Sequence, residues 1–239
     1  MRILKFINQQ LIKDTNMKHL YTSIYHNPGI SRAHLSKQTA LSKTTVSTLI
    51  DELIERNFIL DGGAGESGTT GRKPNQLYLR RNSHFVVVFN WYENRIYTHL
   101  VDIAGTSVFQ EACELKQGEA YVSASRNCFQ NSVLQHCAPD EILGICVVIA
   151  AMIDEKHGEI YSTTISLPSM EGSQILDSLK EAFPDYPVDL LNDTACYSYA
   201  EKVYGNIKEK NFAFLNFGRG IGATLFTEGR KLGLAEVVK

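Results

Sequence analysis

The chain has 239 residues, of which 44% are hydrophobic, 10% aromatic and 21% charged. This composition is typical of globular proteins and excludes a disordered chain, a collagen and a coiled coil. No apolar run approaches the roughly 20 residues of a membrane span, and the N-terminal segment lacks a signal-peptide cleavage site. We therefore expect a soluble cytoplasmic protein that does not contact a membrane. Five cysteines without a CxxC pair predict free thiols rather than disulfides.

Charge is unevenly distributed along the chain. Residues 1–82 contain six Lys and six Arg against six Asp and Glu, a net charge of +6, whereas the whole chain carries −2. The remainder is therefore acidic. A basic module followed by an acidic one is expected when the first module alone meets a polyanion such as nucleic acid. An uneven distribution of surface charge that has no function would give the same net charges for the two parts of the chain.

The first 82 residues have the pattern of a winged helix-turn-helix. Asn27-Pro28-Gly29 ends a first helical pattern, and Ser31 and Ser42 are the expected N-caps of two more helices. A stretch with five glycines, residues 61–74, then separates two strands. The expected elements are helices over residues 4–25, 31–38 and 43–57, and strands over 58–60 and 76–80. Three helices followed by a hairpin predict a DNA-binding domain over residues 1–82, with the third helix as the recognition helix.

The predicted recognition helix separates apolar from polar residues. Its expected buried stripe is Val46, Leu49, Ile50, Leu53 and Ile54. The face left outside carries Lys43, Thr44, Thr45, Ser47 and Thr48. These are the base-contact candidates, because the N-terminal part of a recognition helix enters the major groove. Ser31 and Arg32 suit a phosphate oxygen at the start of the supporting helix, while Arg72 and Lys73 in the wing loop suit the DNA backbone or a narrow minor groove.

After residue 82 the pattern changes to strands and helices of a mixed α/β sheet. Three successive strands predict an antiparallel meander, and the later alternation of strands with helices is typical of an α/β fold. The expected strands cover residues 85–89, 95–101, 107–113, 142–149, 188–191, 212–217 and 221–226, and the expected helices cover 119–137, 172–183 and 194–204. Residues 83–239 are thus expected to form a second domain.

Few residues of the second domain indicate chemistry. Asn192 and Asp193 follow a strand and precede a helix, the position where α/β proteins place ligand contacts, although Asp193 fits equally well as an N-cap. Gly218, Gly220 and Gly222 would let backbone amides approach a phosphate, but the needs of a hairpin explain them better. The histidines and cysteines lack ligand spacing, so no metal, cofactor or catalytic residue is expected.

The segments 30–36 (ISRAHLS), 41–47 (LSKTTVS), 53–57 (LIERN) and 71–74 (GRKP) resemble the DNA-binding domain of ROK-family repressors, which are bacterial regulators of sugar metabolism that share a fold with sugar kinases. Asn192-Asp193 is similar to the Asn-Asp of the family's sugar-binding segment, and residues 217–223 (FGRGIGA) are similar to its second phosphate loop. The resemblance runs over nearly the whole chain and is more specific in the helix-turn-helix.

The departures from the family pattern bear on activity. ROK kinases carry an Asp-x-Gly-Gly-Thr loop after the first strand of the sugar domain, where residues 90–94 here read NWYEN. We therefore do not expect ATP use. Ala150-Ala151 replaces a Pro-Gly turn. The chain also ends before the family's later sugar contact, its zinc site and much of its second lobe, so the resemblance implies a second lobe truncated at the C-terminus.

The resemblance implies an actin/hexokinase-like (ribonuclease H-like) mixed-sheet fold for residues 83–239. We predict a sequence-specific transcriptional regulator, expected to repress sugar-metabolism genes, that binds a double-stranded DNA operator as a homodimer. A small sugar effector would bind at Asn192 and Asp193. Two alternatives stay open: a sugar kinase-like enzyme that uses Asp193 as a base, and a DNA-binding dimer that senses no effector.

Overall fold

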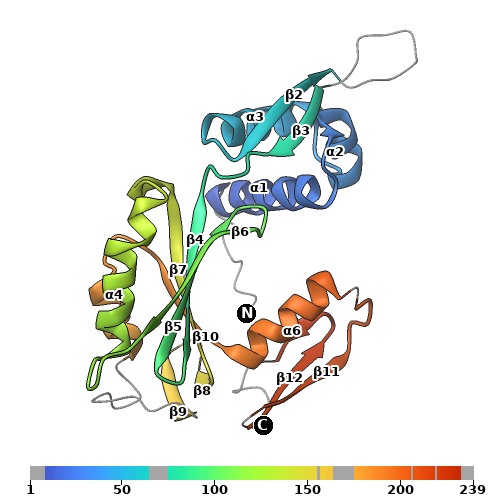
Figure 1. Ribbon diagram of the computed structural model, residues 1–239. Coiled ribbons are helices and arrows are strands. Elements are labelled where there is room, and N and C mark those ends of the chain that lie inside the picture. Colours follow the sequence, from blue (N-terminus) through green and yellow to red (C-terminus); the bar gives the residue numbers. More distant parts are fainter. Residues whose placement is uncertain are drawn as a thin grey trace, which may run out of the picture. The chain divides into compact units, whose positions relative to one another are not determined.

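The computed structural model describes residues 9–64, 75–154, 157–163, 175–205, 207–218 and 220–232. The chain divides into two units (Figure 1). The first comprises Met1–His84 with the turn Asp102–Thr106, and the second comprises Phe85–Val101 with Ser107–Lys239. None of the helices within the described residues combines the length and apolar composition needed to cross a membrane.

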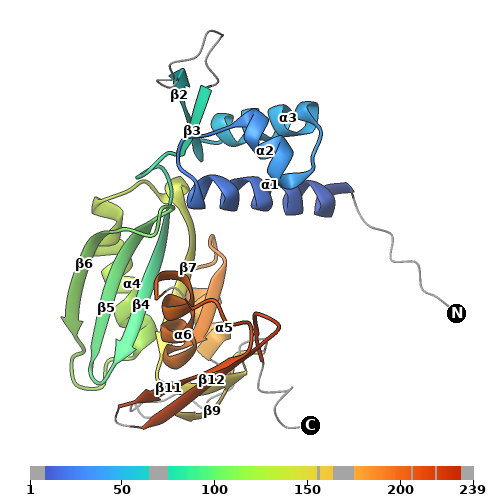
Figure 2. The same cartoon turned by 90° about the vertical axis from the view of Figure 1, so that its right-hand side faces the viewer.

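The first unit is a winged helix-turn-helix, as predicted (Figure 2). Its elements are α1 (Gln9–His26), β1 (Ile30–Ser31), α2 (Arg32–Thr39), α3 (Lys43–Glu55), β2 (Ile59–Ala64) and β3 (Asn75–Leu79). The strands β2 and β3 pair antiparallel and form the base of the wing. The sequence pattern missed β1, which adds two residues to the other edge of β3.

Local signals fix where the helices of this unit begin and end. Ser31 Oγ accepts the backbone N–H of His34 at 3.3 Å and caps α2, and Ser42 Oγ accepts that of Thr45 at 3.0 Å and caps α3. Both caps were predicted, and each satisfies a helical N–H that would otherwise lack a partner. Ala40, in the left-handed region at φ 57°, ends α2 and turns the chain toward α3.

One apolar core holds the three helices and the wing together. Its buried members are Met17, Leu20, Ile24, Leu35, Val46, Leu49, Ile50, Leu53, Ile59 and Leu77. Four of the five residues in the predicted stripe of α3 are therefore buried, while Ile54 is partly buried and packs against the same core. Burial of this stripe leaves the opposite face of α3 to solvent.

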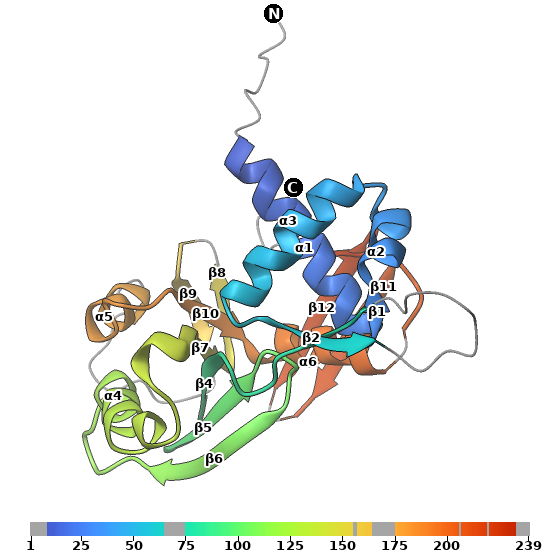
Figure 3. The ribbon, with the colours of Figure 1, turned by 90° about the horizontal axis from the view of Figure 1, so that it is seen from above.

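The second unit is built on a mixed five-stranded sheet with the order β10-β7-β4-β5-β6. Its larger elements are β4 (Phe85–Tyr92), β5 (Arg95–Asp102), β6 (Ser107–Glu114), α4 (Tyr121–Asn131), β7 (Ile142–Ile149), α5 (Ile175–Ala182), β10 (Val188–Asn192) and α6 (Asp193–Tyr204). The strands β10, β7 and β4 run parallel, and β6 pairs antiparallel with β5. Helices α4 and α5 cover one face of the sheet, and α6 lies on the other (Figures 1 and 3).

Three features of this unit differ from the predictions. The helix expected over residues 119–137 ends at Asn131, because the backbone of Ser132 leaves the helical region, and short 3-10 turns follow at Val133–Gln135 and Pro139–Glu141. A hairpin of β8 (Ala151–Asp154) and β9 (Glu159–Thr163) was not predicted. The strands β11 (Phe212–Phe217) and β12 (Ile221–Thr227) form their own sheet with β13 (Arg230–Lys231) instead of extending the mixed sheet.

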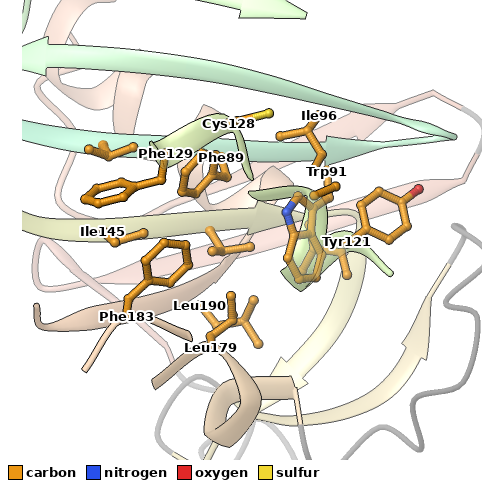
Figure 4. Close-up of a cluster of buried hydrophobic side chains, with 14 of the residues drawn as sticks. Phe89, Trp91, Ile96, Tyr121, Cys128, Phe129, Ile145, Leu179, Phe183 and Leu190 are labelled. Atoms are coloured by element: carbon orange, nitrogen blue, oxygen red, sulfur yellow. The ribbon is translucent and has the colours of Figure 1, made fainter. Parts of the chain in front are cut away.

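Aromatic side chains fill the space between the mixed sheet and its helices α4 and α5 (Figure 4). Trp91 stacks on Tyr121 with ring centroids 5.0 Å apart, and its indole N–H donates to Ser125 Oγ at 2.9 Å. Phe183 contacts Phe89 from the other end of the cluster, with centroids 5.9 Å apart. This packing draws the last part of β4 into the core.

The core of the first unit predicts how two leucines on α1 respond to substitution. Leu20 is 0% exposed and Leu11 is 61% exposed. Leu20→Ala should lower the free energy of unfolding by about 2–5 kcal/mol, because it leaves a cavity, whereas Leu11→Ala should change it by less than about 0.5 kcal/mol. Urea denaturation of the full chain, followed by circular dichroism, measures both. Equal effects would contradict this account of the core.

Candidate functional site

The polar face of α3 carries the five predicted base-contact residues. Lys43, Thr44 and Thr48 are exposed, whereas Thr45 and Ser47 are half-buried. Within the described residues, the side chains of Lys43, Thr44 and Thr48 form no hydrogen bond or ion pair, so their donors and acceptors are available to a partner. The Thr45 hydroxyl lies 2.8 Å from Ser42 Oγ and thus belongs to the cap of α3.

Arg32 links three elements of the winged helix. Its guanidinium donates to Asp51 Oδ1 on α3 at 2.7 Å and to the Ser47 carbonyl at 3.4 Å. A second nitrogen lies 3.9 Å from Asp61 Oδ2 in the wing strand β2. Arg32 therefore holds the start of α2 against α3 and the wing. Ser31, the other residue predicted to contact phosphate, uses its hydroxyl to cap α2.

The base of the wing is well fixed. Asp61 Oδ2 accepts the side-chain amide of Asn75 at 2.9 Å, and Oδ1 accepts the Gly63 N–H at 3.2 Å. Tyr78 packs so closely on Gly62 that an added Cβ would lie 2.8 Å from its ring. The two predicted wing cations, Arg72 and Lys73, lie outside the described residues.

The second candidate site lies where the parallel strands of the mixed sheet end. In register, Trp91 on β4 pairs with Ile149 on β7, which pairs with Asn192 on β10. Asn192 is the N-cap of α6: its Oδ1 accepts the Ala195 N–H at 2.9 Å, and its Nδ2 donates to the Ala151 carbonyl at 2.6 Å. The capping role that Asp193 was thought to fit belongs to Asn192, one residue earlier.

Asp193 has one carboxylate oxygen that is available to accept a hydrogen bond from a ligand. Its Oδ1 accepts the Thr194 N–H at 2.6 Å and lies 3.3 Å from the Thr194 hydroxyl. Within the described residues no donor reaches Oδ2. One turn later, burial raises the pKa of Tyr197, and the nearby charges of Asp193, Cys196 and Tyr92 raise it further. Sequence reasoning missed both tyrosines. Tyr197 lies four residues after Asp193 on α6, a spacing that the sequence could have shown, whereas the proximity of Tyr92 to Tyr197 depends on how α6 packs beside the end of β4.

The glycine motif between β11 and β12 has a packing explanation. A Cβ added to Gly222 would lie 2.1 Å from Thr194 Oγ1, so glycine is what lets β12 approach the first turn of α6. Asn216 on β11 reaches the same hydroxyl at 3.4 Å. A Cβ added to Gly218, in contrast, would meet nothing within 4 Å. Close packing against Thr194 is therefore sufficient to explain why glycine is present at position 222.

Trp91 lies in the segment, residues 90–94, that the sequence resemblance matches to the glycine loop of ROK kinases. Its side chain is fully buried between the sheet and α4. Tyr92 then follows as an exposed residue, and the chain turns directly from β4 into β5. This turn is a hairpin connection held by a core aromatic residue, and it lacks the glycines that let backbone amides cradle a phosphate.

The first unit is a winged helix-turn-helix, and the second is an α/β domain built on a mixed sheet. Residues 13–59 match the winged helix-turn-helix DNA-binding family, and residues 128–233 match the ROK family. The chain thus combines an N-terminal match to a DNA-binding winged helix-turn-helix with a match to the ROK family in its second unit.

Similar curated proteins include repressors. The chain is 28% identical over 229 residues to the xylose repressor of Caldicellulosiruptor bescii, covering 93% of this chain and 56% of the relative. It is 25% identical over 227 residues to the xylose repressor of Bacillus spizizenii, covering 91% and 57%. The DNA-binding transcriptional repressor Mlc of Escherichia coli is 20% identical over 227 residues, covering 92% and 55%. The chain spans slightly more than half the length of these relatives.

A solved structure shares the fold over most of the chain. It is the crystal structure of a ROK family transcriptional regulator, a homologue of the E. coli MLC protein. The TM-score is 0.75 at 19% sequence identity, and the match covers 92% of this chain and 56% of that one. The arrangement of a winged helix-turn-helix followed by a ROK-type sheet is thus common to both proteins.

The close approach of Gly222 to Thr194 predicts that replacing this glycine by alanine destabilises the protein more than replacing Gly218, a glycine of the same motif. Gly222→Ala should lower the free energy of unfolding by about 1–3 kcal/mol, because β12 and α6 must separate to admit the methyl group. Gly218→Ala is the matched control and should have little effect. Thermal unfolding of the two variants measures the difference. Equal melting temperatures would show that Gly222 is not needed for packing.

Proposed function

We propose that this protein is a sequence-specific DNA-binding transcriptional repressor of sugar-metabolism genes. The observation that carries the proposal is the polar face of α3, which presents Lys43, Thr44 and Thr48 on a capped helix in a unit of net charge +6 over residues 1–82. The names of the relatives, xylose repressor and Mlc repressor, support the same function.

In this proposal the N-terminal turns of α3 enter the major groove. Lys43 and Thr44 lie in the first turn and Thr48 one turn later, so all three reach base edges from one side of the helix. Ser47, which is half-buried, would contact a base from the side of the helix. The Thr45 hydroxyl bonds to Ser42 and so supports the N-cap of α3. Lysine pairs with the acceptors of guanine, while threonine offers a hydroxyl to any base and a methyl group to thymine.

The flanking residues position the helix on the DNA backbone. The N–H groups of the first turn of α2, behind Ser31, suit a phosphate oxygen. Arg32 acts mainly as a positioning residue, because Asp51 and Asp61 already neutralise its charge. Arg72 and Lys73 are proposed to place positive charge against the DNA from the wing loop.

Repression requires two such helices at a fixed spacing. We propose a homodimer, because a two-fold protein bound to a pseudo-palindrome places recognition helices about one helical turn apart. A sugar that binds one of two dimer conformations more tightly would then change the affinity for DNA.

The proposed effector site is the strand-end site of the second unit. Asp193 would accept hydrogen bonds from sugar hydroxyls through Oδ2, with Tyr92 and Tyr197 beside it. Asn192 orients Asp193 by capping α6, since both ends of its amide are already bonded within the protein. We propose that the site binds sugar without phosphoryl transfer. The buried Trp91, in the segment that the sequence resemblance matches to the kinase glycine loop, supports this distinction.

The proposal predicts that Lys43→Ala and Thr44→Ala each weaken operator binding by about 1–3 kcal/mol, because each removes a contact with a base. Fluorescence anisotropy on a duplex from upstream of the protein's own gene measures the affinity. Lys18→Ala is the matched control, since it removes the same charge from an exposed position on α1 and should change affinity little. Equal losses in Lys43→Ala and Lys18→Ala would point to general charge attraction and contradict base contact by α3.

The effector proposal predicts that a sugar raises the melting temperature of the chain, because a ligand of the folded state adds about 2.7 kcal/mol of stability at 100 times its Kd. Xylose is the first sugar to test, given the names of the relatives. Asp193→Asn should abolish the shift, and Asp189→Asn, at an exposed position on the preceding strand β10, should keep it. A wild-type chain that binds its operator but is stabilised by no sugar would favour a regulator without an effector.

A further inference from the structure

A small polar cluster lies inside the second unit, on the face of the mixed sheet that α4 covers (Figure 1). Glu111 and Cys113 are two residues apart on β6, so their side chains point to the same face of the sheet. Helix α4 covers that face and contributes Cys128. One carboxylate oxygen and the two sulfur atoms all lie within 4.8 Å of one another. In Figure 4, Cys128 lies on the side of the aromatic cluster where Ile96 is drawn, and Ile96 is the cross-strand neighbour of Cys113.

The cluster contains buried polar atoms that lack partners. Glu111 Oε1 is buried and forms no hydrogen bond. Thr98, the cross-strand neighbour of Glu111, is 0% exposed, and its hydroxyl oxygen is likewise buried without a partner. Buried oxygen atoms are nearly always paired, and exceptions commonly mark a site for an ion, a water molecule or a reaction. Two of them beside two thiols therefore indicate a site.

Electrostatics indicates which kind of ligand would satisfy these atoms. Within the described residues no Lys or Arg forms an ion pair with Glu111. A bound cation would supply the missing positive charge, because it stabilises thiolates and a carboxylate together.

We propose that Glu111, Cys113 and Cys128 form a binding site for a thiophilic divalent cation, of which Zn²⁺ is the main candidate. Zinc holds sulfur at about 2.3 Å and carboxylate oxygen at about 2.0–2.2 Å, so ligand atoms this close can reach one ion by small side-chain rotations. On binding, each thiol releases its proton to solvent. Mg²⁺ and Ca²⁺ are excluded, because they prefer sites made of oxygen atoms alone.

A metal bound at this site would link the edge strand of the mixed sheet to a helix. The strand β6 is at the edge of the five-stranded sheet and pairs on one side with β5. A metal shared by β6 and α4 would fasten this edge strand to the helix. The inference is independent of the proposed DNA-binding function, and its test involves neither DNA nor sugar.

The test uses the full chain, kept reduced and then titrated with Co²⁺ alone and with Zn²⁺ alone. We expect a single Co²⁺ to produce thiolate-to-cobalt charge-transfer absorption, Zn²⁺ to displace it, and Zn²⁺ to raise the melting temperature. Cys113→Ser and Cys128→Ser should lose the absorption, and Glu111→Gln should weaken binding while keeping the fold. Cys137→Ser is the matched control, since it removes another partly buried thiol of the same unit and should bind cobalt like the wild type.

A second measurement needs no substitution. Iodoacetamide labelling of the wild-type chain, mapped by mass spectrometry, should show that Zn²⁺ protects Cys113 and Cys128 but not Cys137. The proposal is overturned if no thiolate absorption develops, if the absorption survives in Cys113→Ser, or if Zn²⁺ gives these two thiols no protection.

Discussion

The apolar stripe of α3 is the constraint on which the rest of the first unit depends. A helix that buries Val46, Leu49 and Ile50 against α1 and α2 must present Lys43, Thr44 and Thr48 on its opposite face. The core thus determines which side chains are available to a partner. The Ser42 cap and the bond from Arg32 to Asp51 then fix where that face begins and how it sits beside α2 and the wing.

In the second unit, the alignment of parallel strand ends has the corresponding role. The carboxyl ends of β4, β7 and β10 bring Trp91, Ile149 and Asn192 into register. Side-chain packing then determines which polar atoms at these strand ends are available to a ligand. Trp91 is buried in the core, and the side chain of Asn192 caps α6. Asp193 keeps one carboxylate oxygen without a donor among the described residues, and the proposed effector site is built on it.

The sequence predicted the features that depend on short-range patterns. The caps at Ser31 and Ser42, the stripe of α3 and the strand over residues 142–149 follow from spacing alone, and the structure has them. It did not predict the end of α4, where the backbone of Ser132 leaves the helical region, or the β8–β9 hairpin. It also did not predict the separate β11–β12 sheet, because which strands share a sheet depends on contacts between distant segments. The cluster of Glu111, Cys113 and Cys128 was missed for the same reason: strand register and helix packing bring its members together across 17 residues of sequence.

The most direct test of the account is the salt dependence of binding to the DNA upstream of the protein's own gene, compared with a scrambled duplex of equal composition. Sequence-specific regulation predicts tighter binding to the upstream duplex by about 10³-fold or more at physiological salt, because base contacts persist when counterions weaken the phosphate contacts. Equal affinity for the two duplexes, with the same steep loss as salt increases, would reduce the winged helix to a basic patch and contradict sequence-specific regulation.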